Sequence, residues 1–205
     1  MQLRLAALRD AFYHTQDVSA ILDNRVAALG DKLEKQFGIH LPGKTGIDIY
    51  FSPNGGCTAA IVAEISAAKK SVYVLAYSFT SVQVASALIL AYGRKLDVKI
   101  VLDPCNIGSA GSQLQAVYYK TKIPLWIDGE HAIAHNKVIV IDKSTVVTGS
   151  FNFSEQAETG NAENLIIVRQ KDVAKKYLDN FNLHLGHSVP YVPTMTIPAN
   201  VMPEV

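Results

Sequence analysis

Two basic side chains near the middle of the chain have the types and the spacing needed to hold a phosphate. His135 and Lys137 open a segment that continues through residues 138–141, an uninterrupted run of Val and Ile. β-Branched residues favour strands, and the Lys-Ser pair after Asp142 is typical of a turn, so residues 135–142 are predicted to form a buried strand. Alternate side chains of a strand share a face, which places the imidazole and the ammonium roughly 6–7 Å apart on the same side. Both can then reach one phosphate.

A second pair of polar residues follows a predicted return strand. Residues 146–148 are a short β-branched run, and after it Ser150 and Asn152 share a face two residues apart. Polar side chains are costly to bury on such hydrophobic segments unless they have partners. Four polar groups at this spacing therefore indicate a site rather than a solvated surface.

The complete pattern, H-x-K-x4-D-x6-G-S-x-N, resembles the signature of the phospholipase D superfamily, and every position of it is filled between His135 and Asn152. The surrounding chain is similar to the small bacterial nuclease branch of this superfamily, whose members carry a single copy of the motif. The segments that carry this likeness, in the same order, are residues 51–53, 76–80, 97–101, 123–125, 149–153 and 161–164. The resemblance covers residues 47–187 and leaves out the first 46.

Cleavage of a phosphodiester needs a nucleophile, an acid for the leaving oxygen, and fixed positive or donor groups around the phosphoryl oxygens. Neutral imidazole is nucleophilic near pH 7, so His135 can form a phosphohistidine. Lys137, Ser150 and Asn152 can stabilise the developing charge. One ring cannot both attack and protonate on opposite sides of the phosphorus, so a second copy of His135 from a twofold-related chain is the expected acid. The resemblance likewise implies a homodimer with one composite site.

The two acidic residues of the predicted site have different expected roles. Glu163, eleven residues after Asn152, is similar to the family's carboxylate that accepts a hydrogen bond from the histidine; such a group fixes the ring's tautomer and stabilises imidazolium. The alternative for Glu163 is a solvated charge at a strand end. Asp142 completes the motif and is counted with its catalytic residues, but it lies on the face opposite His135 if the strand is regular. We expect Asp142 to anchor the turn or an ion pair rather than to touch the phosphate.

Three further residues are candidate substrate contacts: His131, Ser78 and Phe79. His131 lies four residues before His135, a spacing that would form a metal pair on a helix, but the β-rich context argues against a helix there. No metal and no cofactor are expected, because a lysine and two imidazoles already balance the phosphate charge. Other aromatic residues near the motifs can stack bases or pack in the core; these are Tyr118, Tyr119, Trp126, Phe151 and Phe153.

The composition is that of an ordinary globular chain. With 205 residues, of which 49% are hydrophobic and 18% charged, it can bury one core and carry an appendage. A net charge of +1 is uninformative about nucleic-acid binding, because only a strongly basic domain would be a positive sign. Two cysteines, Cys57 and Cys105, are too few for a disulfide framework.

We expect no membrane-spanning helix, since no apolar run reaches about 18 residues. No signal peptide is apparent, so the compartment stays open: exported or periplasmic if a leader was removed, and cytoplasmic otherwise.

Three segments of the chain differ in pattern. Residues 1–46 combine helical spacing of apolar residues with a Gly- and Pro-containing linker, which predicts an N-terminal helical extension. Residues 47–187 alternate strand and helix patterns, which predicts an α/β catalytic domain: a phospholipase D-like layered mixed sheet flanked by helices. Residues 188–205 contain four prolines and are predicted to be extended or disordered. Strands are expected at 47–51, 71–77, 98–103, 123–127, 135–142, 146–148 and 165–168, and helices at 58–69, 82–95, 113–119 and 172–185.

Three functions are compatible with these residues. The favoured one is a non-specific endonuclease acting on DNA, with RNA as a second nucleic-acid substrate, because the single-motif branch resembled here is nucleolytic. The second is a phospholipase D or cardiolipin hydrolase acting on membrane phospholipid, with the helices of residues 1–46 lying on the bilayer. The third is a non-catalytic adaptor with a decayed site. The intact polar set of the motif argues against decay.

Overall fold

The two strands that are buried at every position lie at the centre of the sheet. The computed structural model describes residues 46–193, and within them β2 (Ser71–Ala76) and β5 (Lys137–Ile141) are buried at every position. Continuous hydrophobic runs are typical of strands that are covered on both faces. β2 and β5 pair antiparallel, with Ala76 opposite Lys137 and Val72 opposite Ile141. Lys137 therefore lies at the same edge of the sheet as the carboxyl end of β2.

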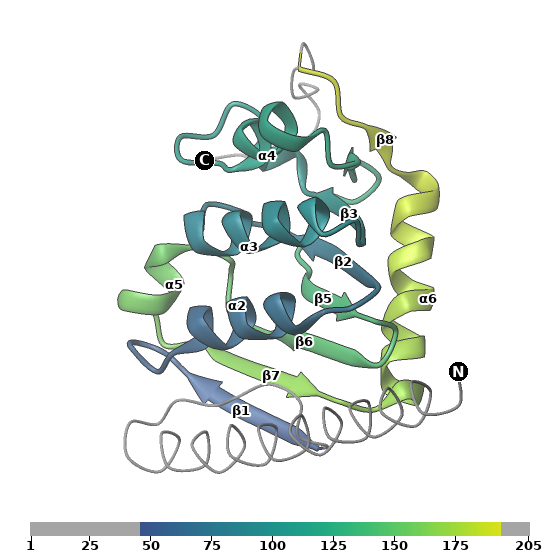
Figure 1. Cartoon of the computed structure of the whole chain (residues 1–205). Coiled ribbons are helices and arrows are strands. Elements are labelled where there is room, and N and C mark those ends of the chain that lie inside the picture. The colour runs from purple at the N-terminus through teal and green to yellow at the C-terminus, as the bar shows by residue number, and fades with distance from the viewer. Residues whose placement is uncertain (1–45, 194–205) are drawn as a thin grey trace, which may run out of the picture. The chain divides into compact units, whose positions relative to one another are not determined.

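Eight strands of the described region form one mixed sheet in the order β1-β7-β6-β5-β2-β3-β4-β8 (Figure 1). β2, β3 and β4 are parallel, whereas the pairs from β2 through β5, β6 and β7 to β1 are antiparallel, as is the pair of β4 and β8. The remaining strands are β1 (Ile47–Phe51), β3 (Asp97–Leu102), β4 (Leu125–Ile127), β6 (Thr145–Gly149), β7 (Asn164–Val168) and β8 (Val189–Pro190). The carboxyl ends of the three parallel strands meet at one edge.

Helices pack on both faces of the sheet (Figure 1). The described helices are α2 (Cys57–Ala67), α3 (Val82–Gly93), η1 (Pro104–Asn106), α4 (Leu114–Thr121), α5 (Glu155–Thr159) and α6 (Lys171–His187). Alternation along β2 divides the core: Val72 and Val74 join the cluster under α2 and α3, while the ring of Tyr73 stacks on Phe181 of α6 with 5.1 Å between centroids. The predicted layered α/β fold is confirmed. None of these helices has the length and hydropathy to span a membrane.

Most of the expected elements form, with ends shifted by a few residues. The main error concerns the strand predicted over 135–142: β5 begins at Lys137, so His135 precedes the strand. η1, α5 and β8 were not predicted. β8 lies in the segment expected to be extended, where Val189 and Pro190 pair with the edge strand β4, a position that tolerates proline. The predicted N-terminal extension, apart from Gly46, lies outside the described residues, as does the tail after residue 193.

A buried arginine ties the outer strands to a helix. Arg169, just after β7, forms ion pairs with Asp48 of β1 and Glu64 of α2. Glu64 is buried, and a buried charge is costly unless it is paired. The partners lie 121 and 105 positions from Arg169. No local pattern in the chain indicates such a contact.

Gly149, the glycine of the motif, occupies a position that no side chain fits. Its φ is +149°, and an added Cβ would lie 2.2 Å from the carbonyl oxygen of Asn164. That oxygen accepts hydrogen bonds from the amides of Ser150 and Phe151, at 3.1 and 3.3 Å. The missing side chain thus lets the end of β6 approach β7 beside the predicted site.

We predict that Gly149→Ala lowers the free energy of unfolding by about 2–4 kcal/mol, because left-handed strain and a backbone clash act together. Urea unfolding measures the change. Gly186→Ala on α6 is the matched control, since a Cβ there meets nothing within 4 Å and alanine favours a helix over glycine. Equal destabilisation by the two substitutions would contradict the close approach of β6 to β7.

Candidate active site

His135 and Lys137 are held together at the edge of the central strand pair. Tyr77 continues the pairing of β2 with β5 by donating its amide to the carbonyl of Asn136, at 2.9 Å. Its ring lies 4.6 Å from the His135 ring, centroid to centroid, and 5.1 Å from the Lys137 ammonium. Lys137 Nζ also donates to the carbonyl of His135, at 3.0 Å. Tyr77 therefore positions both basic groups, with the imidazole exposed and the ammonium beneath it.

The Lys137 ammonium is buried without an ion pair among the described residues. The residue is 6% exposed, and burial lowers its pKa below 10.5 even though Glu163 and Asp103 act in the opposite direction. Among the described residues the ammonium makes one hydrogen bond, to the His135 carbonyl, and lies near the Tyr77 ring, and a buried cation without a closer anion is costly. An anion brought to this edge would remove that cost, so the environment of Lys137 suits a phosphate.

Ser150 and Glu163 form a hydrogen-bonded unit next to the end of β6. The Ser150 hydroxyl donates to Glu163 Oε2 at 2.5 Å and accepts from the amide and side chain of Asn164, at 3.1 and 3.2 Å. Asn161 Nδ2 donates to Glu163 Oε1 at 3.0 Å. The hydroxyl proton of Ser150 is thus directed at Glu163, and it must turn away from this carboxylate if it is to reach a phosphoryl oxygen.

Glu163 is anchored through its backbone as well as its side chain. Its amide donates to Ser52 Oγ at 3.1 Å, its carbonyl accepts from the Ser52 amide at 3.1 Å, and Ser52 Oγ donates to the carbonyl of Asn161 at 2.9 Å. Within the described region, the carboxylate bonds Ser150 and Asn161, with no hydrogen bond to the His135 ring. Glu163 does act on Lys137, whose pKa it raises against the effect of burial.

Asn152 projects from a segment whose neighbours are fixed in the core. Phe151 and Phe153 on either side of it are fully buried, so the alternating side chain of Asn152 faces the other way. Its Oδ1 is buried and has no hydrogen-bond partner among the described residues. In the described part of the chain, Asn152 Nδ2 likewise makes none of the side-chain hydrogen bonds that occupy Ser150.

Comparison with known families shows where this chain belongs. The chain matches the family described as "Cardiolipin synthase, PLD-like domain" over residues 61–185, which is more than half of its length. The chain belongs to the phospholipase D superfamily. This match confirms the superfamily that the motif indicated and the fold expected of that superfamily.

Named relatives share most of this phospholipase D domain. A phospholipase D of Rickettsia typhi is 38% identical over 163 residues, which are 80% of this chain and 79% of that protein. The mitochondrial cardiolipin hydrolase of Mus musculus is 26% identical over 140 residues, 68% of this chain and 63% of that protein. The structure of Nuc from Salmonella typhimurium, a phospholipase D family member, matches with a TM-score of 0.68 and 33% identity, covering 72% of this chain and 99% of Nuc. The protein is thus a phospholipase D-family phosphodiesterase, a hydrolase.

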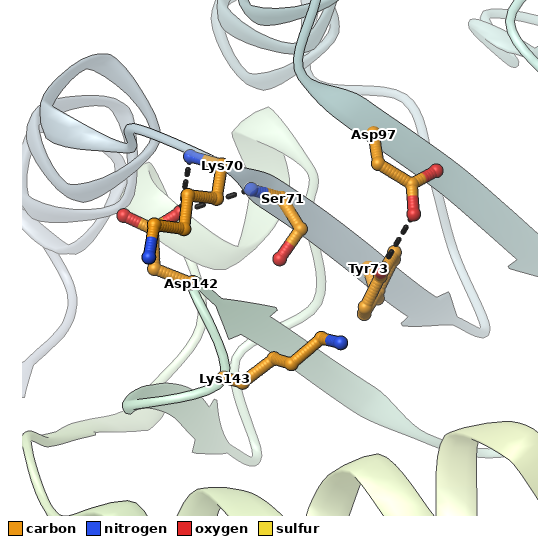
Figure 2. Close-up of a pocket in the computed structure, with 6 residues that line it drawn as sticks. All are labelled: Lys70, Ser71, Tyr73, Asp97, Asp142 and Lys143. Atoms are coloured by element: carbon orange, nitrogen blue, oxygen red, sulfur yellow. Dashed lines mark hydrogen bonds between the residues drawn. The ribbon is translucent and has the colours of Figure 1, made fainter.

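Asp142 lies at the opposite end of β5 from Lys137. Five residues of a strand separate their positions by roughly 16 Å, beyond the reach of one phosphate. The Asp142 carboxylate accepts from the amides of Lys69, Lys70 and Ser71 at 2.7–2.9 Å, beside a cavity of about 350 Å³ (Figure 2). Asp142 therefore holds the turn between α2 and β2 in this structure and does not join the catalytic group.

The three candidate substrate contacts fall in different environments. Phe79 is fully buried and forms a bridge to Phe153, so its ring is a core residue and not a substrate contact. The burial of Phe151 and Phe153 excludes them from base stacking for the same reason. Ser78 is half-buried in the loop after Tyr77. His131 is exposed, but its ring turns toward Asp128, with 3.3 Å between Nδ1 and Oδ1.

Several residues that support the site were not identified from the sequence. Asp103 accepts from the amides of Cys105 and Ala134, at 2.8 and 2.7 Å, and so fixes the segment leading to His135. Asn106 donates to the carbonyl of Tyr77 at 2.6 Å. Burial raises the pKa of Cys105 to about 12, so its thiol is not a competing nucleophile. A sequence signal that could have identified such supporting residues is a polar residue directly after a buried strand, as Asp103 is after β3.

We predict that Asp142→Ala lowers the free energy of unfolding by about 2–3 kcal/mol, because three amides lose their acceptor. Activity per folded molecule should stay close to wild type, since Asp142 is far from Lys137. Urea unfolding and turnover, normalised to the folded fraction, measure the two effects. Asp142→Asn keeps one acceptor oxygen and should lose less stability. A variant of wild-type stability that has lost turnover would instead place Asp142 in the chemistry.

We predict that Lys137→Met lowers turnover by about 10²–10³-fold, as does loss of an oxyanion-hole donor, yet raises the melting temperature at pH 7. A folded-state pKa below 10.5 means that the charged lysine opposes folding at pH 7. This cost of the wild type disappears as the pH rises from the lowered pKa toward 10.5. The thermal advantage of Lys137→Met should therefore shrink at alkaline pH. Lys69→Met, at an exposed position, is the control, and a lower melting temperature for Lys137→Met than for this control would refute the argument.

Proposed function

We propose that this protein is a metal-independent endonuclease that cleaves DNA, and RNA as a second substrate, through a phosphohistidine in a site shared by two chains. The observation that carries the proposal is the position of two basic groups around Tyr77 at the sheet edge: the exposed imidazole of His135 and the buried ammonium of Lys137, which has no ion pair within residues 46–193. The ammonium provides fixed positive charge, and the imidazole is accessible to an incoming phosphorus.

His135 is the nucleophile in this mechanism. Its ring nitrogen forms a bond to phosphorus while the leaving oxygen departs with a proton from a second imidazole. Lys137 and the Asn152 amide stabilise the charge on the nonbridging oxygens, placed there before reaction. Ser150 and Glu163 form the adjoining hydrogen-bonded unit, and the negative charge of Glu163 partly offsets that of the Lys137 ammonium. Water then attacks the phosphohistidine, and the second imidazole removes its proton.

The second imidazole is proposed to come from a partner chain. Besides His135, the described histidines are His131, His184 and His187, and all three are directed at the Asp128 carboxylate. None of the three is free to serve as the acid opposite His135. A twofold axis beside His135 would supply an identical ring, and the exposure of His135 leaves it accessible to such a partner. The two rings would titrate as a coupled pair, one neutral and one protonated.

Nucleic acid is preferred as the substrate because of the single motif copy and the open position of His135. Lys122 directly follows α4, and its ammonium lies 4.4 Å from the Tyr118 ring centroid, while Tyr119 is 60% exposed. This combination of charge and aromatic surface suits single strands. The specific alternative is hydrolysis of a membrane phospholipid. The names of the Rickettsia and mouse relatives, phospholipase D and cardiolipin hydrolase, favour it.

The deciding experiment is a digestion panel of plasmid DNA, RNA and phospholipid vesicles with EDTA present. We expect the wild type to degrade nucleic acid in the chelator and His135→Ala to lose at least about 10³-fold of this activity. Cardiolipin or phosphatidylcholine hydrolysis with DNA left intact would establish the lipid alternative. A strict requirement for a divalent cation, seen while the chelator leaves the protein folded and His131→Ala keeps wild-type turnover, would refute the phosphohistidine mechanism.

Mixed dimers test the shared site in the same assay. Wild type and His135→Ala, carrying different tags, are co-expressed and the heterodimer is isolated. If each site uses both histidines, the heterodimer is nearly as inactive as the His135→Ala homodimer. A heterodimer with half of the wild-type activity, or a fully active monomer, would show that each chain works alone.

A further inference from the structure

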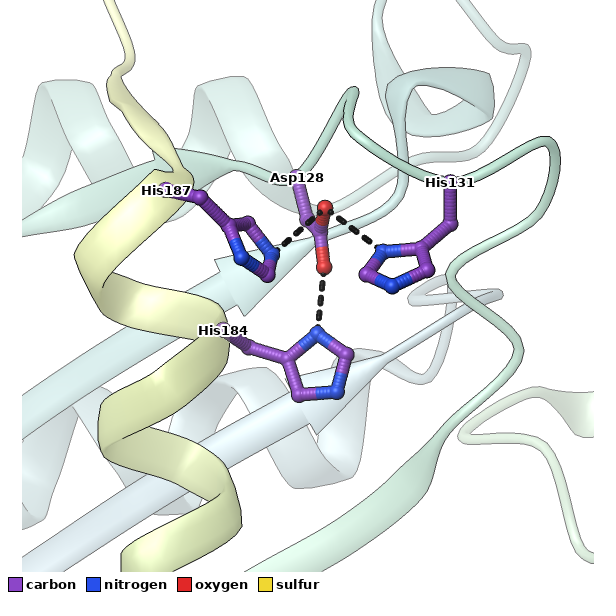
Figure 3. A group of neighbouring side chains, drawn as sticks. All are labelled: Asp128, His131, His184 and His187. Carbon is purple, nitrogen blue, oxygen red and sulfur yellow. Dashed lines mark hydrogen bonds and ion pairs between the residues drawn. The ribbon is translucent and has the colours of Figure 1, made fainter.

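Three imidazoles converge on one buried carboxylate next to the end of β4. Asp128 is 1% exposed, and its oxygens lie 2.6 Å from His184 Nδ1, 3.2 Å from His187 Nε2 and 3.3 Å from His131 Nδ1 (Figure 3). His184 and His187 come from the last turn of α6, and His131 from the loop after Asp128. One potential ligand atom from each of the four residues lies within 4.8 Å of all the others.

Hydrogen bonding alone does not account for this cluster. The Nε2 atom of His187 is buried and has no hydrogen-bond partner among the described residues, although it lies 3.2 Å from Asp128 Oδ1. The bond angles, not the distance, exclude a hydrogen bond. A buried nitrogen that makes no hydrogen bond lowers the stability of the metal-free protein. Coordination of a metal ion by this nitrogen would remove that cost.

The cluster is built on rigid supports. The Asp128 amide donates to the carbonyl of Leu102 at 2.9 Å, and Asp128 Oδ1 accepts from the amide of Glu130 at 3.2 Å. His184 and His187 are three positions apart on a helix, so they lie on one face. The centroids of the three imidazole rings are 5.1–5.3 Å apart. His131, whose side chain is 46% exposed, forms the open side through which an ion can enter.

We propose that Asp128, His131, His184 and His187 bind one zinc ion as a structural site. Three nitrogens and one carboxylate oxygen are ligands that zinc accepts in tetrahedral geometry, at about 2.0–2.2 Å from the ion. Such ligands lie roughly 3.3 Å from one another, so the present atoms need only small ring movements to bind. Imidazole ligands favour zinc over magnesium or calcium. Four protein ligands fill the coordination shell and leave no position for a substrate.

The ion would join α6 to the segment that leads to the catalytic histidine. Residues 128–134 connect β4 to His135, and α6 covers one face of the sheet. Zinc coordination would fasten this segment at Asp128 and His131 while the Asp103 carboxylate holds its other end at the Ala134 amide, at 2.7 Å. The site is independent of the proposed phosphohistidine chemistry, because His135 is not one of its ligands.

The test measures zinc directly in protein purified without a histidine tag. We expect one zinc per chain by inductively coupled plasma mass spectrometry after dialysis, and the visible spectrum of tetrahedral cobalt when Co²⁺ replaces zinc. His131→Ala, at an exposed position where folding is not at risk, and His187→Ala should weaken zinc binding by at least about tenfold. His135→Ala is the matched control: it lacks a histidine of the same segment and should keep its zinc.

Thermal unfolding gives a second reading on the same proteins. At the same zinc concentration, zinc should raise the melting temperature of wild type and of His135→Ala, and raise that of His131→Ala and His187→Ala by a smaller amount. Absence of bound zinc in folded wild type, or equal zinc content in all variants, would overturn the proposal and leave a carboxylate–imidazole cluster without metal. Both readings are made without substrate, so a failure of the proposed nuclease function would not affect them.

Discussion

The burial of one ammonium group is the constraint on which the rest of the site depends. β5 is buried at every position because it lies at the centre of a sheet covered on both faces, so its first residue, Lys137, is buried too. A lysine at that place lowers stability unless an anion approaches it. Pairing with β2 aligns Lys137 with Ala76, and Tyr77 then supplies an aromatic face for the ammonium and the His135 ring. The fold tolerates the loss of stability caused by burying this ammonium at the place where a phosphate of the substrate can offset it.

Strand β5 also explains why the Lys and the Asp of the motif have different roles. Lys137 begins β5 beside the carboxyl end of β2, and Asp142 follows it beside the start of β2. The Asp142 carboxylate binds the amides of Lys69, Lys70 and Ser71 and so fixes where β2 begins. Asp142 thus stabilises one end of the strand pair, while Lys137 stands at the other end, beside His135.

How far the sequence could predict the molecule follows from the range of the interactions. Runs of β-branched residues and helical spacing located most strands and helices, and the motif brought His135, Lys137, Ser150 and Asn152 into one hypothesis. The start of β5 was misjudged because the local pattern cannot show where pairing with β2 stops. The bond from Ser150 to Glu163 and the contacts of Asp128 with α6 join distant residues; His184 Nδ1 and Asp128 are 56 positions apart. Only the folded chain brings such groups together.

The position of His135 outside the strand has a physical reason. Every residue of β5 is buried, so an imidazole within the strand would be less accessible to another molecule than one that precedes it. Placed two residues earlier, the imidazole is exposed, yet it must still be held. Two carboxylates that follow β3 and β4 hold the segment before His135. Asp103 accepts a hydrogen bond from the amide of Ala134, and Asp128 contacts the ring of His131. Because parallel strands end at one edge, both acids stand beside the segment that carries the histidine. The segment that carries His135 is thus fixed by carboxylates at the sheet edge, and the His135 ring is accessible because it precedes the buried strand.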